Sequence, residues 1–400
     1  MENAAVLAWT KRIVITMGVL LLGACSWFSS DEVKPAKLVS FTETTALAKQ
    51  WSHHLGSQGE PEWFLRLQPV LDSSIIYAAN AKGKVYAFQS TDGDTLWSVN
   101  IHLPLAGAVG AGEGLVLLGT VDGKLVALQQ RNGTEAWRYQ LSSEILSPAQ
   151  VGDGIVVAQT IDGKVVALDV KTGEVRWSYT ATVAPLTLRG SATPLIDNGV
   201  VYLVFTTGKL VAVKSDTGFL LWEQQIALPE GRSELERIID SIGQPVLSGE
   251  DLYVANYQSH VSSVNHNNGT ITWTEKISTA GQLASGNGNL YLTQSDDTVT
   301  AMSMASGRHL WENNQLANRQ LTSPAMLGAY VAVADAEGYI HLLNQGDGQF
   351  AGRYAFDDDG VRTPLVSDGT TLYALSNDGV LASFRLTEAT WFRKIINFLF

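Results

Sequence analysis

The sequence predicts an all-β fold, specifically an eight-bladed β-propeller with four antiparallel strands in each blade. Three observations predict it. A short apolar strand motif occurs eight times along the 400 residues, the copies begin 38 to 51 residues apart, and most copies end with a glycine followed four residues later by a tryptophan. A repeat of about 40 residues with four strands is typical of propeller blades. The composition agrees, because 45% hydrophobic residues, 37 glycines and 11 tryptophans provide material for a large core.

Each repeat is predicted to contain four strands in a fixed order. The first opens near a proline or its equivalent, the second is an apolar strand such as residues 154–158, and the third is the repeated motif itself. The third strands begin at Val85, Leu125, Val165, Leu210, Val261, Val299, Ile340 and Val380. A glycine at a tight turn then leads to the fourth strand, since glycine readily adopts the positive φ that such a turn requires.

The fourth strands carry the periodic tryptophans. These are Trp97, Trp137, Trp177, Trp222, Trp273 and Trp311, with Gly352 at this position in the seventh copy. Indoles buried between radially packed sheets would cover roughly 150–250 Å² each, and they could hold neighbouring blades together without a disulfide. We therefore assign these tryptophans to structure and not to a ligand site.

The N-terminus is predicted to close the ring. The eighth copy has three clear strands but lacks its own glycine and tryptophan. Residues 47–54, which contain Trp51, match the fourth-strand pattern and precede the first proline-type strand. Closure of this kind removes the open sheet edges that favour aggregation. The propeller is therefore expected to span residues 41–386.

A secretory signal precedes the propeller. Lys11 and Arg12 are followed by an uncharged, mostly apolar run at residues 13–22. This run is too short to span a bilayer comfortably, because spanning takes about 20 apolar residues. We expect residues 1–24 to be a signal peptide that is removed.

Cys25 is the only cysteine of the chain, so an internal disulfide and a multi-thiolate metal cluster are both excluded. The stretch Leu22-Gly23-Ala24-Cys25 resembles the bacterial lipobox, which implies that Cys25 is the lipidated first residue of the mature protein. Ser26 replaces the aspartate that retains such proteins in the inner membrane, so the resemblance implies the outer membrane of a Gram-negative bacterium, facing the periplasm. Residues 25–40 are expected to be a lipidated, flexible tether. An ordinary signal peptide with a chance cysteine is the alternative.

Two enlarged loops mark a candidate binding surface. The interval from the tryptophan position to the next proline position is 17 residues from Trp177 and 23 from Trp222, against 10 to 13 in most other copies. These two loops belong to consecutive blades and leave the same face, so they should lie side by side. Insertions on one face of a repeat protein commonly carry its binding function. Neutral growth of the loops is the alternative.

The two loops contain leucines flanked by charged residues, a combination that suits protein binding. Leu186 and Leu188 lie in the first loop, while residues 234–236 of the second loop could equally form a solvated helical turn. An 18-residue loop after Trp51, containing Trp63 and Phe64, is a weaker third candidate because it lies at the ring closure.

Taken together, the lipobox, the glycine and tryptophan repeat and the sequence Leu186-Thr-Leu188-Arg189-Gly190 resemble BamB (YfgL), the lipoprotein family of the outer-membrane β-barrel assembly (Bam) machinery. The blade pattern alone is shared with quinoprotein-like propellers built from PQQ-type repeats. The resemblance implies a non-enzymatic scaffold that docks onto the POTRA domains of BamA, and through BamA onto the other Bam components. It also implies assistance to the folding and insertion of barrel proteins, with unfolded outer-membrane proteins as further candidate partners.

The resemblance also implies which residues bind BamA. The family's two leucines, arginine and first aspartate map onto Leu186, Leu188, Arg189 and Asp240. The family's second aspartate is replaced here by Ile242. We add Arg237 because it lies in the same Arg-x-x-Asp stretch as Asp240.

The tail departs from the family pattern. Residues 387–400 place apolar side chains such as Trp391, Ile395 and Leu399 at helical spacing on one face, which predicts an amphipathic helix. Such a helix could pack on the propeller, or it could contact the membrane surface or a partner.

Enzymatic and nucleic-acid functions are not favoured. A net charge of −12 gives no electrostatic reason to bind phosphate backbones. A quinoprotein dehydrogenase would be expected to have adjacent cysteines and a calcium site, and the seven histidines form no zinc motif, so we expect no cofactor and no metal. A periplasmic sensor that binds a ligand in the central channel remains an alternative.

Overall fold

The computed structural model describes residues 34–56, 67–188, 190–241 and 243–389. The chain divides into two compact units, Met1–Ala36 and Lys37–Phe400, and every described strand lies in the second unit. The signal peptide, Cys25 and most of the predicted tether fall outside the described residues. Within the described part of the chain, no helix has the length and apolar character needed to cross a membrane.

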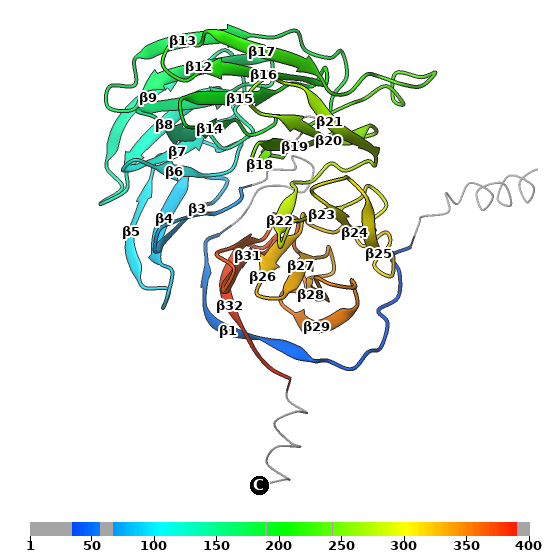
Figure 1. Ribbon diagram of the computed structural model, residues 1–400. Helices are drawn as coiled ribbons and strands as arrows, with labels where there is room; N and C mark the ends of the chain where they lie inside the picture. The colour runs from blue at the N-terminus through cyan, green and yellow to red at the C-terminus, as the bar shows by residue number, and fades with distance from the viewer. Residues whose placement is uncertain (1–33, 57–66, 189, 242, 390–400) are drawn as a thin grey trace, which may run out of the picture. The chain divides into compact units, whose positions relative to one another are not determined.

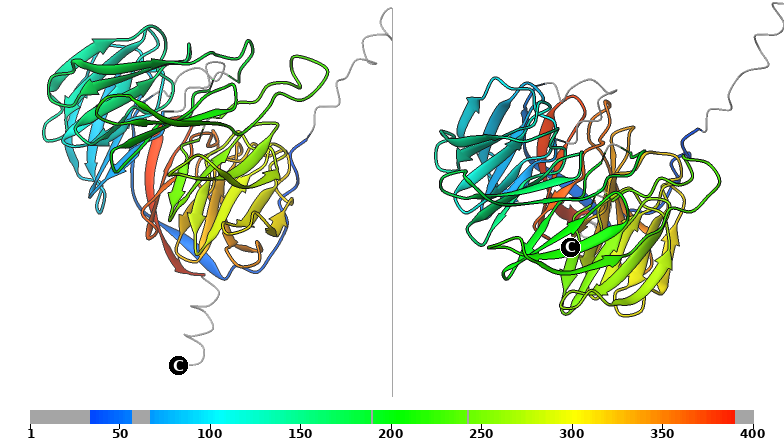
Figure 2. Two further views of the ribbon diagram at one scale, coloured as in Figure 1. Left: turned by 45° about the horizontal axis from the view of Figure 1, so that its top comes forward. Right: turned by 90° about the horizontal axis from the view of Figure 1, so that it is seen from above.

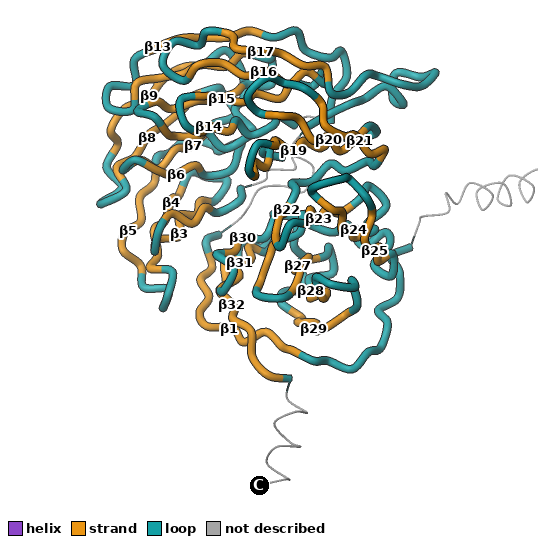
Figure 3. The backbone as a smooth tube through the Cα atoms, in the orientation of Figure 1, coloured by secondary structure: helices purple, strands orange, loops and turns teal. Residues whose placement is uncertain are grey.

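The second unit consists of eight four-stranded antiparallel sheets that follow one another around a ring, which confirms the predicted propeller (Figure 1). The described residues are strands and loops throughout (Figure 3). The first strands of the blades are β2 (Val70–Asp72), β6 (Gly110–Gly112), β10 (Gln150–Gly152), β14 (Leu195–Asp197), β18 (Val246–Ser248), β22 (Ala284–Gly286), β26 (Ala325–Leu327) and β30 (Val366–Ser367). First strands of most neighbouring blades contact one another, so the first strands form the inner side of the ring.

The remaining strands follow outward in the same order in every blade. The second strands are β3 (Ile75–Ala79), β7 (Leu115–Gly119), β11 (Ile155–Gln159), β15 (Val200–Val204), β19 (Asp251–Ala255), β23 (Asn289–Thr293), β27 (Tyr330–Ala334) and β31 (Thr371–Leu375). The third strands are β4 (Lys84–Gln89), β8 (Lys124–Gln129), β12 (Lys164–Asp169), β16 (Lys209–Lys214), β20 (His260–Asn265), β24 (Val299–Ser303), β28 (Tyr339–Asn344) and β32 (Val380–Glu388). The outer strands are β5 (Thr95–Asn100), β9 (Glu135–Gln140), β13 (Val175–Thr180), β17 (Leu220–Gln225), β21 (Ile271–Lys276), β25 (His309–Asn313), β29 (Phe350–Ala355) and, in the eighth blade, β1 (Thr45–His54).

The first strand of the chain completes the last blade, as predicted. β1 pairs antiparallel with β32 from Thr45 opposite Glu388 to His54 opposite Val380. The blue and red strands also lie side by side in the turned views (Figure 2). The pairing carries β32 through Glu388, so Thr387 and Glu388 are strand residues and not the start of the predicted C-terminal helix, because Ala46 and Thr45 supply their partners. Residues 390–400 of that helix lie outside the described residues.

The core of the ring lies between blades and not within them. Each of the eight buried apolar clusters found among the described residues joins two consecutive blades, including the pair formed by the eighth and first. Between the fourth and fifth blades, for example, Tyr202 and Val204 pack with Leu252 and Val254. Strands buried on both faces explain why the second and third strands are continuous apolar runs in the sequence.

The repeat tryptophans join each blade to the next. Each indole Nε1 donates a hydrogen bond of 2.7 to 3.0 Å to a main-chain carbonyl of the following blade. The pairs are Trp51–Ser90, Trp97–Gln130, Trp137–Val170, Trp177–Ser215, Trp222–His266, Trp273–Met304 and Trp311–Gln345. The same rings cover the turn glycines of the following blade, and a Cβ on Gly218 would lie 2.7 Å from the Trp177 ring. The glycine and tryptophan repeat is therefore a contact between blades.

The seam between the seventh and eighth blades uses a different contact. Gly352 replaces the tryptophan, and a Cβ at this position would lie 2.6 Å from the carbonyl oxygen of Thr45. The chain before β1 fills the space, since Phe41 stacks on Phe350 with ring centroids 5.3 Å apart. Thr44 donates its main-chain N–H to Ala351 at 2.8 Å. The missing tryptophan is thus compensated by the N-terminal segment.

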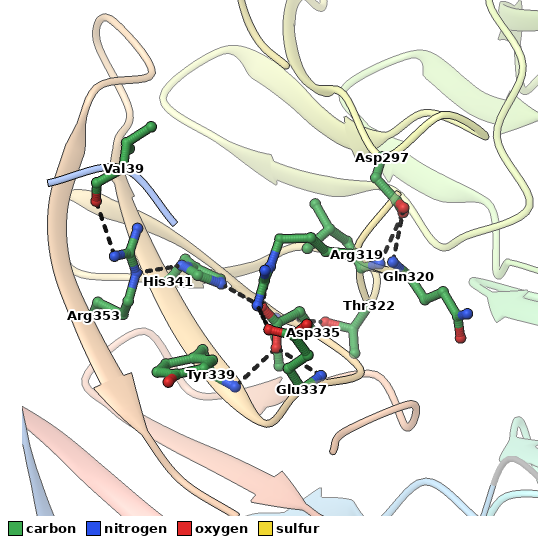
Figure 4. Close-up of polar contacts among 12 residues, drawn as sticks. Val39, Asp297, Arg319, Gln320, Thr322, Asp335, Glu337, Tyr339, His341 and Arg353 are labelled. Atoms are coloured by element: carbon green, nitrogen blue, oxygen red, sulfur yellow. Dashed lines mark hydrogen bonds and ion pairs between the residues drawn. The ribbon is translucent and has the colours of Figure 1, made fainter. Parts of the chain in front are cut away.

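A buried ionic network lies beside this seam (Figure 4). Arg319 donates from Nε to Asp335 at 2.6 Å, and His341 Nε2 lies 2.8 Å from the same carboxylate oxygen. Arg353 donates from Nε to His341 Nδ1 at 3.2 Å and from Nη1 to the Val39 carbonyl at 3.1 Å. Buried charges are tolerated when they are paired in this way. The network links the seventh blade to Val39, a residue that the sequence assigned to the tether.

Candidate partner-binding surface

The two enlarged loops lie side by side, as the repeat spacing predicts. The first connects β13 to β14 and the second connects β17 to β18. The main-chain N–H of Leu188 in the first loop donates to Asp240 Oδ2 in the second at 2.8 Å. A hydrogen bond between loops of consecutive blades fixes one loop against the other, so the two loops form one surface.

The predicted leucine anchors are exposed on this surface. Leu186 is 45% exposed and Leu188 is 39% exposed, although leucine is among the residues most often buried. Arg237 is also exposed. Arg189, and Ile242 at the position of the family's second aspartate, lie outside the described residues. Two apolar side chains of the first loop and one cation of the second are therefore exposed on the two adjoining loops.

Asp240 lies inside the second loop, which differs from the direct contact that the resemblance implies. The residue is only 1% exposed. Its carboxylate accepts the N–H groups of Leu188 and Ser241, and its main-chain carbonyl accepts the N–H of Tyr257 at 2.7 Å. A carboxylate surrounded by donors in a buried position is suited to holding them in place. Asp240 therefore positions the first loop and does not present its charge to solvent.

The middle of the second loop forms a capped turn that displays Leu235. The sequence Ser233-x-x-Glu236 is a capping box: Ser233 Oγ accepts the N–H of Glu236, and Glu236 Oε2 accepts the N–H of Ser233. Leu235 is 68% exposed. The prediction of a solvated helical turn is close to this geometry, but it gave no role to Leu235. The S-x-x-E pattern is the sequence signal that could have identified a rigid turn here.

The third candidate loop contains Trp63 and Phe64, and both residues lie outside the described residues.

At the inner side of the ring, Gln282 donates to Gln68 at 3.1 Å and Gln244 donates to Gln150 at 3.3 Å. These glutamines belong to blades that are not neighbours, so the two hydrogen bonds connect non-adjacent blades at the inner side of the ring.

The described residues contain no candidate metal site. No group of three or more His, Cys, Asp or Glu side chains there is arranged to hold a metal ion. The buried pair of Asp335 and His341 is enclosed by Arg319 and Arg353, so both groups are already used in structural contacts.

Comparisons with known proteins agree with the geometry. The family model described as outer membrane protein assembly factor BamB matches residues 81–313 and 295–391. The outer membrane protein assembly factor BamB of Pseudomonas aeruginosa is 49% identical over 378 residues, which cover 94% of this chain and 99% of that protein. The chain belongs to the BamB family of outer membrane protein assembly factors. It is thus an outer-membrane-associated protein of a Gram-negative bacterium.

Solved structures with a similar fold include a BamB and several enzymes. The crystal structure of BamB from Moraxella catarrhalis has a TM-score of 0.77 at 29% identity and covers 85% of this chain and 99% of that one. A quinohemoprotein alcohol dehydrogenase from Comamonas testosteroni has a TM-score of 0.67 at 13% identity, covering 85% of this chain and 76% of that one, which shows a shared fold alone. The relatives are named as assembly factors, which confirms the prediction of a non-enzymatic protein.

Proposed function

We propose that this BamB family protein is a lipid-anchored scaffold of the Bam machinery that docks onto the POTRA domains of BamA. The docking surface consists of Leu186 and Leu188 in the first loop and Arg237 in the second, together with Arg189. The observation that carries the proposal is the hydrogen bond between Leu188 and Asp240, since a contact between the two enlarged loops supports a single docking surface. Attachment at this surface would leave the rest of the ring available to assist unfolded barrel proteins.

The exposed leucines can supply the binding energy. Full burial of a leucine side chain stabilises by roughly 1.5–3 kcal/mol. Leu186 and Leu188 retain 45% and 39% of their accessible surface, so each offers on the order of 1 kcal/mol when a partner covers it. Because Asp240 already orders Leu188, less conformational entropy is lost on binding. The arginines would orient the partner, as charges at the rim of an interface do.

The proposed surface is tested by capture of BamA. Replacing Leu186, Leu188 and Arg189 together with alanine is expected to reduce affinity at least tenfold, since two anchors and a charge are removed. Leu310→Ala is the matched control, because Leu310 is a 41% exposed leucine on the outer strand of the sixth blade. Undiminished capture by a triple variant with wild-type thermal stability would refute the surface.

The lipid anchor is tested separately. Cys25 at the lipobox position and Ser26 after it support lipidation and outer-membrane sorting on the periplasmic face. Cys25→Ser is expected to release the protein into the soluble periplasmic fraction and to abolish labelling by a radioactive or clickable fatty acid. Persistent acyl labelling of the variant would contradict the assignment of Cys25.

A further inference from the structure

Leu235 and Leu228 are the most exposed large apolar side chains in the described part of the second loop. Leu235 is 68% exposed, compared with 45% for Leu186 and 39% for Leu188. One exposed leucine is ordinary on a protein surface. What sets Leu235 apart is the number of hydrogen bonds that fix the short turn carrying it.

The turn is closed by the Glu236 side chain. Its Oε2 accepts the main-chain N–H groups of Arg232 at 2.6 Å and Ser233 at 3.2 Å, while Ser233 Oγ accepts the N–H of Glu236 at 3.3 Å. The hydrogen bonds from Arg232 and Ser233 also lower the pKa of Glu236, as expected for a carboxylate that accepts backbone donors. Glu236 therefore serves the turn, although it lies on the surface.

The base of the turn is tied to the fifth blade. The Gln258 amide satisfies its neighbours in the orientation in which its nitrogen donates to the carbonyl oxygens of Leu235 at 3.2 Å and Glu236 at 2.8 Å and its oxygen accepts from the Tyr257 hydroxyl. The main-chain N–H of Tyr257 donates to Asp240, which in turn holds Leu188. One chain of hydrogen bonds thus fixes Leu235 and Leu188 in the same framework.

We propose that Leu235 is a third apolar anchor of the docking surface and that the capped turn presents it to an apolar pocket on BamA. This inference rests on the proposed function. The pattern fits an anchor, because ordering a hydrophobic side chain before binding lowers the entropic cost of association. Arg237 follows Leu235 by two residues and is exposed, so an acidic group beside the pocket would complement it. Residues that contribute most of the binding energy lie in fully desolvated pockets near the centre of an interface.

The test measures the affinity of the full-length protein in detergent for full-length BamA. Leu235→Ser is expected to weaken binding about tenfold, whereas Leu310→Ser should change it less than about twofold. Glu236→Ala should weaken binding several-fold through loss of the turn. Glu236→Gln should retain affinity, because an amide oxygen can still accept the two N–H groups. Equal melting temperatures for all variants control for folding.

A double variant distinguishes an anchor from a merely structural residue. If the turn acts by presenting Leu235, Glu236→Ala should add little further loss in the Leu235→Ser background. Full additivity would overturn the presentation mechanism. If Leu186→Ala with Leu188→Ala weakens binding but Leu235→Ser does not, the inference fails while the proposed function stands. If none of these leucine changes weakens binding, the proposed function fails together with the inference.

Discussion

Asp240 illustrates how a buried side chain can control a surface on which it does not lie. Its carboxylate accepts the Leu188 N–H at 2.8 Å while the residue is only 1% exposed. Removing a buried acceptor leaves its donors unsatisfied, which costs about 1–3 kcal/mol. Loss of the Asp240 carboxylate would therefore destabilise the first loop, which carries Leu186 and Leu188. We therefore expect Asp240 to affect BamA binding indirectly, by holding Leu188 in position.

His341 provides a pH-dependent test at the scale of one residue. Its Nδ1 accepts from Arg353, so the neutral ring carries its hydrogen on Nε2, which donates to Asp335. Burial lowers the pKa of His341, and the hydrogen bond to Asp335 only partly opposes this. An unfolded histidine has a pKa of about 6.5. The unfolded chain therefore binds the proton more readily than the folded protein does. The stability contributed by neutral His341 is complete above a pH of about 6.5 and decreases as the pH falls below that value.

We expect the free energy of unfolding to fall between pH 7.5 and pH 5 by up to about 1.4 kcal/mol per pH unit from this group. His341→Gln, which cannot be protonated, should give a flatter profile over the same interval, as measured by urea denaturation. Asp335 loses its stabilising effect only in more acidic solutions, because the pKa of its carboxyl group is lowered. Burial alone would raise this pKa, but hydrogen bonds from His341, the Tyr339 main chain and Arg319 outweigh burial. Identical slopes for wild type and variant would contradict the role given to His341.

At the scale of the element, the unit of stability is the contact between one blade and the next. Trp177 donates to Ser215 at 2.7 Å and covers Gly218, whose φ of 68° is unfavourable for other residues. Glycine is thus required at this position both by the turn and by the Trp177 indole that lies against it. At the seam between the seventh and eighth blades this contact is replaced, because Gly352 stands at the tryptophan position and the segment before β1 occupies the space beside it.

A pair of glycine variants separates the two requirements. Gly199 has a φ of 83°, and a Cβ added there would have no other atom within 4 Å, so Gly199→Ala should cost only the backbone strain of about 1–2 kcal/mol. Gly218→Ala has the same strain and adds a collision with the Trp177 ring. Overpacking of a protein core costs about 1–3 kcal/mol more. Thermal unfolding should therefore rank Gly218→Ala as the less stable variant. Equal destabilisation would show that the indole contact contributes little.

At the scale of the whole molecule, the propeller could be predicted because its repeats are periodic. Glycine, tryptophan and apolar strands recur at fixed intervals, and closure by the strand containing Trp51 followed from a missing fourth strand. Contacts between loops have no period, so the sequence could place Leu188 and Asp240 on one face but could not show that Asp240 is buried beneath Leu188. The end of β32 was also set by a distant partner, Thr45, which pairs with Glu388. The capping box at Ser233 was the one local signal that sequence reasoning left unused.

Closure of the ring also explains how one surface can be enlarged without loss of the fold. Seven of the eight junctions between blades use the same tryptophan contact, while the two longest loops between consecutive sheets away from the ring closure follow β13 and β17. Loops on a rigid scaffold tolerate insertion and commonly carry function. The central claim is therefore that these two loops, and not the outer strands, form the attachment to the Bam machinery.

Site-specific photo-crosslinking in intact cells tests this claim most directly. A photoreactive amino acid would be placed at Leu186 or Leu188 in the loops and, as controls, at the exposed outer-strand leucines Leu96 and Leu310. We predict adducts with BamA from the two loop positions and none from the two controls. Adducts from Leu96 or Leu310, with none from the loops, would contradict the claim.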